Sequence, residues 1–447
     1  MPDVLHSPCY GAWSGEREAV LKYSELSREQ LLALYETLSA SYETYRRAGL
    51  SLDLSRGKPC AEQLDLSLGL LSRNRTAADC KSEGGIDCRN YGLAYGLPEM
   101  KRFFSEITGV DEERIIVGGN SSLTMMFDTV MRAMLYGVVG SPRPWCREEH
   151  LRFLCPAPGY DRHFAICESL GMEMIPITMT EVGPDMDEVE SYVKDPAVKG
   201  IWCVPKYSNP TGITYSDETV IRLAKMETAA PDFRIFWDNA YVVHDLGNTT
   251  DPLLDIFAAA KEYGHENRIF YYPSTTKITF PGAGVAMMAA SEENLAQIKP
   301  ILSVQTIGPD KLNQLRHIEF LRDREGVRRQ MAQHAAILRR KFDILLSALS
   351  QMEGEGIASW TNPRGGYFVS LDVMEGCARR VYALCRDAGV TLTSVGATFP
   401  YGRDPHDRNL RLAPSYPSDE DLSKASEVLV CAVRLAAAEK LLHEKKI

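Results

Sequence analysis

A single lysine, Lys277, stands in a polar tract between two apolar runs near the middle of the chain. The surrounding sequence is FYYPSTTKITFPGAGVAMMAAS, residues 270–291. Most lysines are solvated loop cations, because an ammonium group is costly to bury. A buried lysine with a lowered pKa is instead a nucleophile that can bond covalently to a carbonyl group. The tract therefore has two interpretations, a loop cation or an amine held for covalent chemistry.

Polar residues also follow the ends of several predicted strands. In an open α/β sheet, ligands bind at the carboxyl ends of the strands, so residues just after the strands meet in one crevice. The motifs at these positions are GGNSS (118–122), PGY (158–160), NPTG (209–212), DNAY (238–241) and STTK (274–277). We expect these motifs to form one site.

The GGNSS motif leads directly into a predicted helix and has the features of a phosphate cradle. Its glycines allow close approach of the backbone, and the free N–H groups and dipole of a helix start attract an anion. Asn120, Ser121 and Ser122 are the candidate ligands. The alternative is an ordinary turn and helix cap, for which Gly, Asn and Ser are also common.

The crevice would bring together an acid, a phenol, an amide and an amine, from Asp238, Tyr241, Asn209 and Lys277. A carboxylate such as Asp238 is costly to bury without a cation or hydrogen-bond partner. A cofactor with a ring nitrogen, a phenolic oxygen, an aldehyde and a phosphate would use every one of these groups. Pyridoxal 5′-phosphate (PLP) is that cofactor.

The elements that position these motifs alternate between strand and helix over residues 92–291. Short β-rich runs separated by helices predict an α/β fold with a mostly parallel sheet that is covered on both faces. An amphipathic helix is predicted over residues 27–50, with Ser27 as N-cap and Gln30 at the capping-box position. A long helix around residues 311–350 links this part to a C-terminal strand–helix–strand–helix segment, which predicts a smaller α+β domain.

Composition narrows the class of protein. The chain has 447 residues, 45% of them hydrophobic, and a formal net charge of -10. Its length suggests two domains, and its charge does not suggest nucleic-acid binding. Eleven cysteines lie without zinc-site spacing, which indicates free thiols in a reducing compartment and no metal site. No signal peptide or membrane span is expected, so we predict a cytoplasmic location.

The motifs together resemble fold-type I, class I PLP-dependent aminotransferases over nearly the whole chain. The resemblance is closest to the subgroup of aspartate aminotransferases called type Ic, also known as MocR-like aminotransferases. The motifs that carry it include DLSRGKP, RNYG, PGYDRHF, SNPTG, DNAYVVH, STTKITFPGAGV and NLRLAPS. The resemblance implies a large PLP-binding domain with a seven-stranded, mostly parallel sheet, at residues 75–315. Residues 1–74 and 325–447 would form the small domain.

The resemblance implies a role for each cofactor-binding position. Lys277 resembles the lysine that binds the cofactor aldehyde and later moves a proton. Asp238 matches the partner of the ring nitrogen, and Tyr241 and Asn209 match ligands of the ring oxygen. The other matches are Tyr160 for the stacking aromatic, Asn120, Ser121, Ser122 and Ser274 for the phosphate, and Tyr91 for a tyrosine that reaches the neighbouring subunit's phosphate. Tyr91 thereby implies a homodimer with shared active sites.

For the substrate, Arg411 matches the arginine that binds the α-carboxylate, since a planar fork suits a carboxylate. Gly57 matches the glycine whose backbone meets the same carboxylate, and Asn209 contributes there too. The type Ic likeness implies ping-pong transamination of L-aspartate with 2-oxoglutarate, giving oxaloacetate and L-glutamate. The alternatives are transamination or lyase chemistry on aromatic, branched or alanine substrates, and a PLP-binding ligand sensor.

The sequence departs from the class I pattern at one position. The role of His244 and the identity of a second substrate-binding cation also have to be considered. Gly284 stands where class I enzymes commonly place an arginine that pairs with the phosphate, and Lys311 and Arg316 are candidate replacements. His244, near the DNAY motif, is interpreted as structural, because Lys277 already supplies a base. A dicarboxylate substrate needs a second cation, for which the candidates are Arg364, Arg56 and Lys58.

Overall fold

The computed structural model describes residues 22–247 and 249–445. The predicted N-terminal part of the small domain, and the prediction that no signal peptide is present, rest partly on residues 1–21, which lie outside the described residues. In the described ranges, no helix is long and apolar enough to cross a membrane. Ten cysteines fall in these ranges, and all ten are free thiols, as expected.

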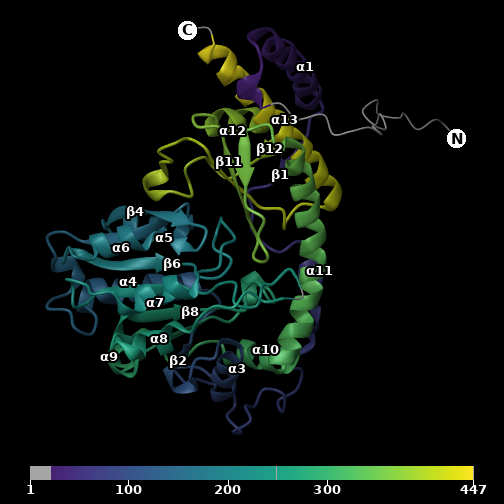
Figure 1. Ribbon diagram of the computed structural model, residues 1–447. Coiled ribbons are helices and arrows are strands. Elements are labelled where there is room, and N and C mark those ends of the chain that lie inside the picture. Colours follow the sequence, from purple (N-terminus) through teal and green to yellow (C-terminus); the bar gives the residue numbers. More distant parts are fainter. Residues whose placement is uncertain (1–21, 248, 446–447) are drawn as a thin grey trace.

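A large sheet forms the centre of one body of the molecule (Figure 1). Its strand order is β2-β9-β8-β7-β6-β3-β4-β5. The bounds are β2 (Ile115–Val117), β3 (Arg152–Ala157), β4 (Glu173–Thr180), β5 (Gly183–Pro184), β6 (Val198–Cys203), β7 (Arg234–Asp238), β8 (Ile269–Tyr272) and β9 (Met287–Ala290). Five adjacent strands, β8 to β4, are parallel, whereas β9 runs antiparallel to both of its neighbours. The predicted α/β fold with a mostly parallel sheet is confirmed.

The sheet has eight strands where seven were predicted. The additional strand is β5, whose two residues turn back antiparallel onto the end of β4. A strand of two residues, glycine and proline, carries no hydrophobic alternation, so the sequence gives no signal for it.

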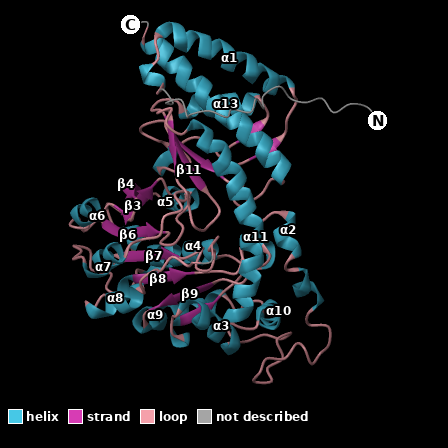
Figure 2. Cartoon of the chain, turned by 45° about the vertical axis from the view of Figure 1, so that its right-hand side comes forward, coloured by secondary structure: helices cyan, strands magenta, loops and turns pink. Residues whose placement is uncertain are grey.

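Helices cover both faces of this sheet, as predicted and as Figure 2 shows. One face packs against α4 (Ser122–Tyr136), α5 (Asp161–Ser169) and α9 (Glu292–Gln305). The other packs against α3 (Pro98–Thr108), α6 (Met186–Tyr192), α7 (Asp217–Lys225), α8 (Ile256–Glu262) and α10 (Lys311–Leu321). Within β7, Phe236 joins the first cluster and Trp237 the second, which is the alternation that a pleated strand requires.

The second body contains the three-stranded antiparallel sheet β10-β11-β13 and a short parallel pair, β1 with β12. Its strands are β1 (Leu52–Asp53), β10 (Ala358–Trp360), β11 (Val369–Val373), β12 (Val390–Thr391) and β13 (Asn409–Leu412). Its helices are α1 (Arg28–Arg47), α12 (Ala378–Asp387) and α13 (Asp419–Glu444), while α2 (Ala61–Asp65) lies against α11 (Arg324–Leu349). The predicted capping box of α1 is present, because Ser27 and Gln30 bond each other's backbone N–H. The domain boundaries themselves stay predictions.

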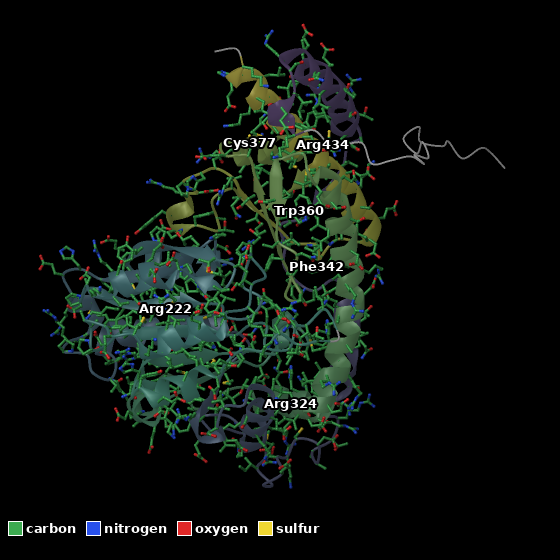
Figure 3. All side chains as sticks on the ribbon, viewed as in Figure 1. Arg222, Arg324, Phe342, Trp360, Cys377 and Arg434 are labelled. Atoms are coloured by element: carbon green, nitrogen blue, oxygen red, sulfur yellow. The ribbon has the colours of Figure 1, made fainter. Side chains whose placement is uncertain are left out.

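The helix expected around residues 311–350 is two helices, α10 and α11. Arg322 takes a left-handed backbone conformation (φ +67°), and the Asp323 side chain caps α11 by accepting a bond from the Gly326 N–H. A Cβ at Gly326 would lie 1.6 Å from the Leu321 carbonyl oxygen, so the close approach at the break requires glycine. The continuous apolar periodicity through this region hides the break. Figure 3 shows Arg324 of α11 beside the large body and Phe342, further along the same helix, closer to Trp360 of β10.

Candidate active site

A cavity of about 190 Å³ opens at the carboxyl ends of the central strands. Eight predicted site residues line it, namely Gly57, Ser121, Ser122, Tyr160, Asn209, Asp238, Tyr241 and Lys277. Its other lining residues are Leu123, Met126, Val204, Ala240, Thr276 and Phe368. Four predicted site residues, Asn120, Ser274, Tyr91 and Arg411, do not line it. The strand-end motifs therefore meet in one place, and the role of each residue stays a prediction.

Lys277 follows β8 and lines this cavity. Burial lowers the pKa of the Lys277 amine from its ordinary value, and the charge of Asp238 opposes that change. The Nζ atom lies 4.9 Å from the centroid of the Tyr241 ring, which is a cation–π distance. A lowered pKa favours the neutral amine, which is the form that attacks a carbonyl carbon. The loop-cation interpretation does not fit these surroundings.

Asp238 is the last residue of β7, and its side chain is almost fully buried. Its Oδ2 atom lies 3.1 Å from Nε2 of His163, and its Oδ1 atom has no hydrogen-bond partner in the described part of the chain. The imidazole of His163 stacks on Trp202 at 4.4 Å between ring centroids, which fixes its plane. A buried carboxylate oxygen without a partner is costly, so this atom is available for a cationic ligand group.

Sequence reasoning missed His163. It lies on α5 three residues after Tyr160, one turn further along the helix, within the PGYDRHF motif. Only its position one turn beyond a predicted stacking residue could have pointed to it.

Two tyrosine rings form part of the wall. Burial raises the pKa of the Tyr241 phenol well above its ordinary value, so the phenol keeps its proton and can donate it in a hydrogen bond. The Tyr241 ring stacks on Tyr367 at 6.1 Å and meets His244 edge-on at 5.5 Å. Burial likewise raises the pKa of Tyr160, whose ring lies edge-on to His163 at 5.0 Å. Both phenols are held by packing on several sides.

The start of α4 forms the other end of the cavity. Ser121 is the N-cap of this helix, and its hydroxyl accepts a bond from the Thr124 N–H at 3.4 Å. Thr276, which the sequence analysis did not select, lines the cavity beside Ser121 and Ser122. The Ser274 hydroxyl lies 2.7 Å from that of Thr276, and Asn120 donates to the Gly282 carbonyl at 3.4 Å. Hydroxyls and a helix N-terminus are groups that can bind an anion, so the predicted role of this end of the cavity stays a prediction.

Gly284 cannot be replaced by a larger residue without movement of its neighbours. A Cβ at Gly284 would lie 2.7 Å from the Thr276 side chain and 2.9 Å from its Cα. Of the candidate replacements for the missing arginine, Lys311 donates to the Gly92 carbonyl at 2.9 Å and lines a different pocket, together with Tyr91. Arg316 does not line the cavity either.

Arg411 lies on β13 and does not line the cavity. Its Nη1 atom donates to Asp161 at 2.9 Å and weakly to Asn209 at 3.5 Å. Its guanidinium carbon lies 5.1 Å from the centroid of the Phe368 ring. Phe368 packs in turn against Gly57, where a Cβ would lie 2.0 Å from the ring. The fork is thus held beside the two residues predicted to meet the substrate carboxylate.

The three candidates for a second cation have other partners. Arg364 is mostly exposed and pairs with Asp251 at 2.7 Å, and Arg56 pairs with Asp53 at 2.9 Å. Lys58 lies over the Tyr416 ring at 4.1 Å. None of these three cations lines the cavity. In the described ranges, no group of three or more His, Cys, Asp or Glu side chains comes together as a metal site.

His244 lies under the loop that carries Lys277. Its Nε2 atom is 3.4 Å from the Lys277 carbonyl oxygen, and its side chain is almost fully buried. Burial lowers the pKa of His244 well below its ordinary value, so the ring is neutral. A neutral ring against the backbone is consistent with the structural role that we predict for it.

Comparison with known proteins extends these observations. The family model described as aspartate amino-transferase matches residues 26–445. A protein of Mycolicibacterium smegmatis, provisionally described as an aminotransferase, is 49% identical over 428 residues, which is 95% of this chain and 100% of that protein. The crystal structure of an aspartate transaminase from Corynebacterium glutamicum has a TM-score of 0.92 and 43% identity, covering 94% of this chain and 100% of that chain.

The fold is also shared with LysN, the α-aminoadipate aminotransferase of Thermus thermophilus, at a TM-score of 0.71 and 22% identity over 94% of this chain and 100% of that chain. The LysN crystal contains N-(5′-phosphopyridoxyl)-L-leucine, an adduct of PLP with an amino acid. These matches confirm the predicted fold type and aminotransferase class. The chain belongs to the aspartate amino-transferase family.

Proposed function

We propose that this chain binds PLP in the cavity at Lys277 and transfers the amino group of L-aspartate to 2-oxoglutarate. The cofactor assignment rests on two unusual groups that line the same cavity. These are the Lys277 amine, whose pKa burial lowers, and the partnerless buried oxygen of Asp238. The 43% identity to an aspartate transaminase supports aspartate as the substrate.

The residues present fit PLP. The Oδ1 atom of Asp238 would accept a hydrogen bond from the protonated ring nitrogen, and the phenol of Tyr241 and the amide of Asn209 would bond the ring oxygen. The N-terminus of α4, with Ser121, Ser122 and Thr276, would hold the phosphate. The Lys277 amine would bond the aldehyde carbon. Each polar group of the cofactor then has a partner among the lining residues.

When bound, PLP supplies an electron sink for the bond that breaks at the substrate Cα. With the cofactor bound, Nζ of Lys277 would take the Cα proton of the substrate, and the lowered pKa of this amine favours the neutral form that can accept it. His163 holds Asp238 in place, so this carboxylate would keep the ring nitrogen of bound PLP protonated. Arg411 binds the substrate α-carboxylate, which orients the Cα–H bond toward Lys277.

The position of Tyr91 supports the proposal that the chain forms a homodimer. This side chain is 81% exposed and lines a pocket away from the Lys277 cavity of its own chain. Such exposure is unusual for a large aromatic residue with a role in its own subunit. We therefore infer a homodimer in which Tyr91 of one chain reaches the phosphate site of the other.

The first test is the visible spectrum of the PLP-loaded protein before and after addition of L-aspartate, without any oxo acid. We expect the visible band of the bound cofactor to bleach and an equivalent of oxaloacetate to form. Subsequent addition of 2-oxoglutarate should restore the band and form L-glutamate. A spectrum that aspartate leaves unchanged, but an aromatic or branched amino acid bleaches, would keep the cofactor assignment and reject the substrate.

A further inference from the structure

The loop that carries Lys277 contacts three buried histidines. This lysine loop, residues 275–279, follows β8, and each of its last three residues contacts one imidazole ring. The rings belong to His244 in the loop after β7, to His317 on α10 and to His334 on α11. All three residues are at most 2% exposed. Histidines that lie far apart in the sequence therefore meet at the lysine.

All three imidazole rings are neutral near neutral pH. Burial lowers the pKa of His317 and of His334 from 6.5 to about 4, and it lowers the pKa of His244 well below 6.5. The positive charge of Lys277 also lowers the pKa of His244. The rings therefore contact the lysine loop without adding a positive charge beside Lys277, whose own pKa depends on burial and on Asp238.

Two of the rings donate to main-chain carbonyl groups. Nε2 of His334 lies 3.0 Å from the Ile278 carbonyl oxygen, and Nε2 of His244 lies 3.4 Å from the Lys277 carbonyl oxygen. A carbonyl oxygen can only accept, so Nε2 carries the proton in both rings. The Gln330 amide adds a bond to the Ile278 carbonyl at 3.3 Å. Within the described ranges, no backbone N–H donates to either carbonyl group, so side chains supply the partners that these groups need.

The third ring accepts a bond from the lysine loop. Nδ1 of His317 lies 2.8 Å from the Asn313 carbonyl oxygen, so Nδ1 carries the proton and Nε2 of the neutral ring is an acceptor. The Thr279 hydroxyl lies 2.9 Å from this Nε2 atom. The Thr279 N–H donates to the Thr275 carbonyl at 2.9 Å, which closes the loop into a turn. The histidine contacts therefore hold a turn that already has one internal bond.

The same network reaches Tyr241, on another side of the cavity. The Gln63 amide donates to Nδ1 of His334 at 3.0 Å and to the Tyr367 hydroxyl at 3.1 Å. The Tyr367 ring stacks on Tyr241 at 6.1 Å between ring centroids. One buried set of contacts thus links the lysine loop, α2, α11 and a tyrosine of the cavity wall.

The position of the Lys277 backbone limits where its amine can act. A lysine side chain is a flexible stem, and a catalytic group that is misplaced by about 1 Å can lose about a hundredfold in rate. We infer that His244, His317 and His334 are positioning residues, which fix the lysine loop so that Nζ of Lys277 reaches the cofactor aldehyde and the substrate Cα. None of the three lines the cavity, so they act through Lys277. This role rests on the proposed function and extends the structural role of His244.

Matched leucine and glutamine variants test the role of His244 and His334. Leucine has no hydrogen-bonding group in its side chain, whereas glutamine keeps an N–H group. With the PLP-loaded protein, we expect His334→Leu and His244→Leu each to slow the bleaching of the visible band by L-aspartate by about tenfold to a hundredfold. The glutamine variants should recover most of the rate. His265→Leu should keep the wild-type rate, because His265 bonds the Ala224 carbonyl at 2.9 Å and does not line the cavity.

Three further measurements separate positioning from a general loss of stability. L-Aspartate with deuterium at Cα should bleach the band more slowly than ordinary L-aspartate, and this isotope effect should increase in the leucine variants, because proton transfer to Lys277 becomes the slow step. In the steady state, kcat should fall with little change in the KM for L-aspartate, because Arg411 keeps its contacts. The dissociation constant for PLP, measured by absorbance, should rise by up to about tenfold, which is the net contribution of one hydrogen bond.

Thr279→Val tests the third contact and serves as a second variant if a leucine variant does not fold. Valine has nearly the shape of threonine without its hydroxyl group, so His317 loses the donor at Nε2. We expect slower bleaching and a larger isotope effect in this variant too.

Folded leucine and valine variants that bleach at the wild-type rate, with an unchanged isotope effect, would overturn the inference. Leucine and glutamine variants that are slowed equally, in proportion to their loss of thermal stability, would also overturn it, because the histidines would then be structural only. Borohydride reduction of the wild type followed by peptide mass spectrometry tests the proposed function separately. PLP fixed on Lys277 together with unaffected variants would reject the positioning role alone, whereas its absence from Lys277 would reject the cofactor assignment as well.

Discussion

Arg411 and Asp161 form an ion pair, with 2.9 Å between Nη1 and Oδ1. Arg411 is the residue predicted to bind the substrate α-carboxylate, whereas Asp161 is the first residue of α5 and directly follows Tyr160, the predicted stacking residue. The carboxylate of Asp161 therefore occupies one edge of the fork that the substrate needs. The position of Asp161 in the first turn of a helix stabilises its negative charge. Asp161 would therefore compete with the substrate α-carboxylate for Arg411.

We expect Asp161→Asn to lower the KM for L-aspartate by up to about fivefold, because a partly exposed ion pair contributes up to about 1 kcal/mol. Tighter retention of the product should lower kcat at the same time. Steady-state kinetics with L-aspartate and 2-oxoglutarate measure both values. Glu168→Gln, on the exposed side of the same helix, is the matched control. An increase in KM would show that Asp161 orients Arg411 rather than competing for it.

Lys277→Ala should abolish transamination and leave the fold intact. The substitution removes both the amine that bonds the cofactor and the base that moves the Cα proton, and base catalysis alone contributes at least about a hundredfold. Circular dichroism should match the wild type, and oxaloacetate formation should fall to background. Lys194→Ala, at an exposed site, should keep full activity. Full turnover by the Lys277 variant would remove the basis of the proposed function.

Gly284→Ala should weaken PLP binding by at least about tenfold. The new Cβ would lie within 3 Å of Thr276, one of the residues at the anion end of the cavity, so that residue must move. The dissociation constant for PLP, measured by absorbance, tests this expectation. Gly282→Ala is the control, because a Cβ at Gly282 meets no atom within 4 Å. Equal affinity in the two variants would mean that Thr276 does not contribute to the phosphate site.

His334 should make the protein less stable in mild acid. Its Nδ1 accepts a bond from Gln63 and its Nε2 donates to the Ile278 carbonyl, and burial lowers the pKa of the ring from 6.5 to about 4. Between these two pH values the unfolded state binds the proton and the folded state does not. The contribution of His334 to the free energy of unfolding therefore decreases as the pH falls from 6.5 to 4.

At pH 4.5 this loss should be about 2–3 kcal/mol relative to pH 7, since a tenfold change in proton affinity corresponds to about 1.4 kcal/mol. Urea unfolding of His334→Gln should show a correspondingly smaller difference between the two pH values. The exposed His406→Gln should behave like the wild type. The same acid sensitivity in His334→Gln as in the wild type would exclude this histidine as the cause.

The residues that sequence could place are those attached to strand ends. Asp238, Asn209 and Lys277 meet because parallel strands deliver their carboxyl ends to one edge, and that rule needs no coordinates. Phe368 and His163 could not be found this way, because tertiary packing alone brings them to the site. Phe368 reaches it from the small body, and His163 lies on a helix behind Asp238.

Two details of the fold were hidden for a similar reason. The break between α10 and α11 depends on the left-handed backbone of Arg322, a residue type that gives no turn signal. Tyr91 and Arg411 match family motifs, yet neither lines the cavity of this chain. Tyr91 is the residue for which we propose a role in a second copy, and Arg411 is paired with Asp161, a contact that no sequence motif predicts.

Helix α11 has 26 residues and is about 39 Å long, so it runs past both bodies of the molecule (Figure 1). Val327 and Met331, near its start, pack into the core of the large body, and Leu338 and Phe342 pack into that of the small one. One residue inserted between Met331 and Leu338 would turn the second half of the helix by about 100° relative to the first. The apolar side chains of one half of the helix would then face water instead of their core. Homologues of this chain should therefore vary in length in the loops and keep a constant length here.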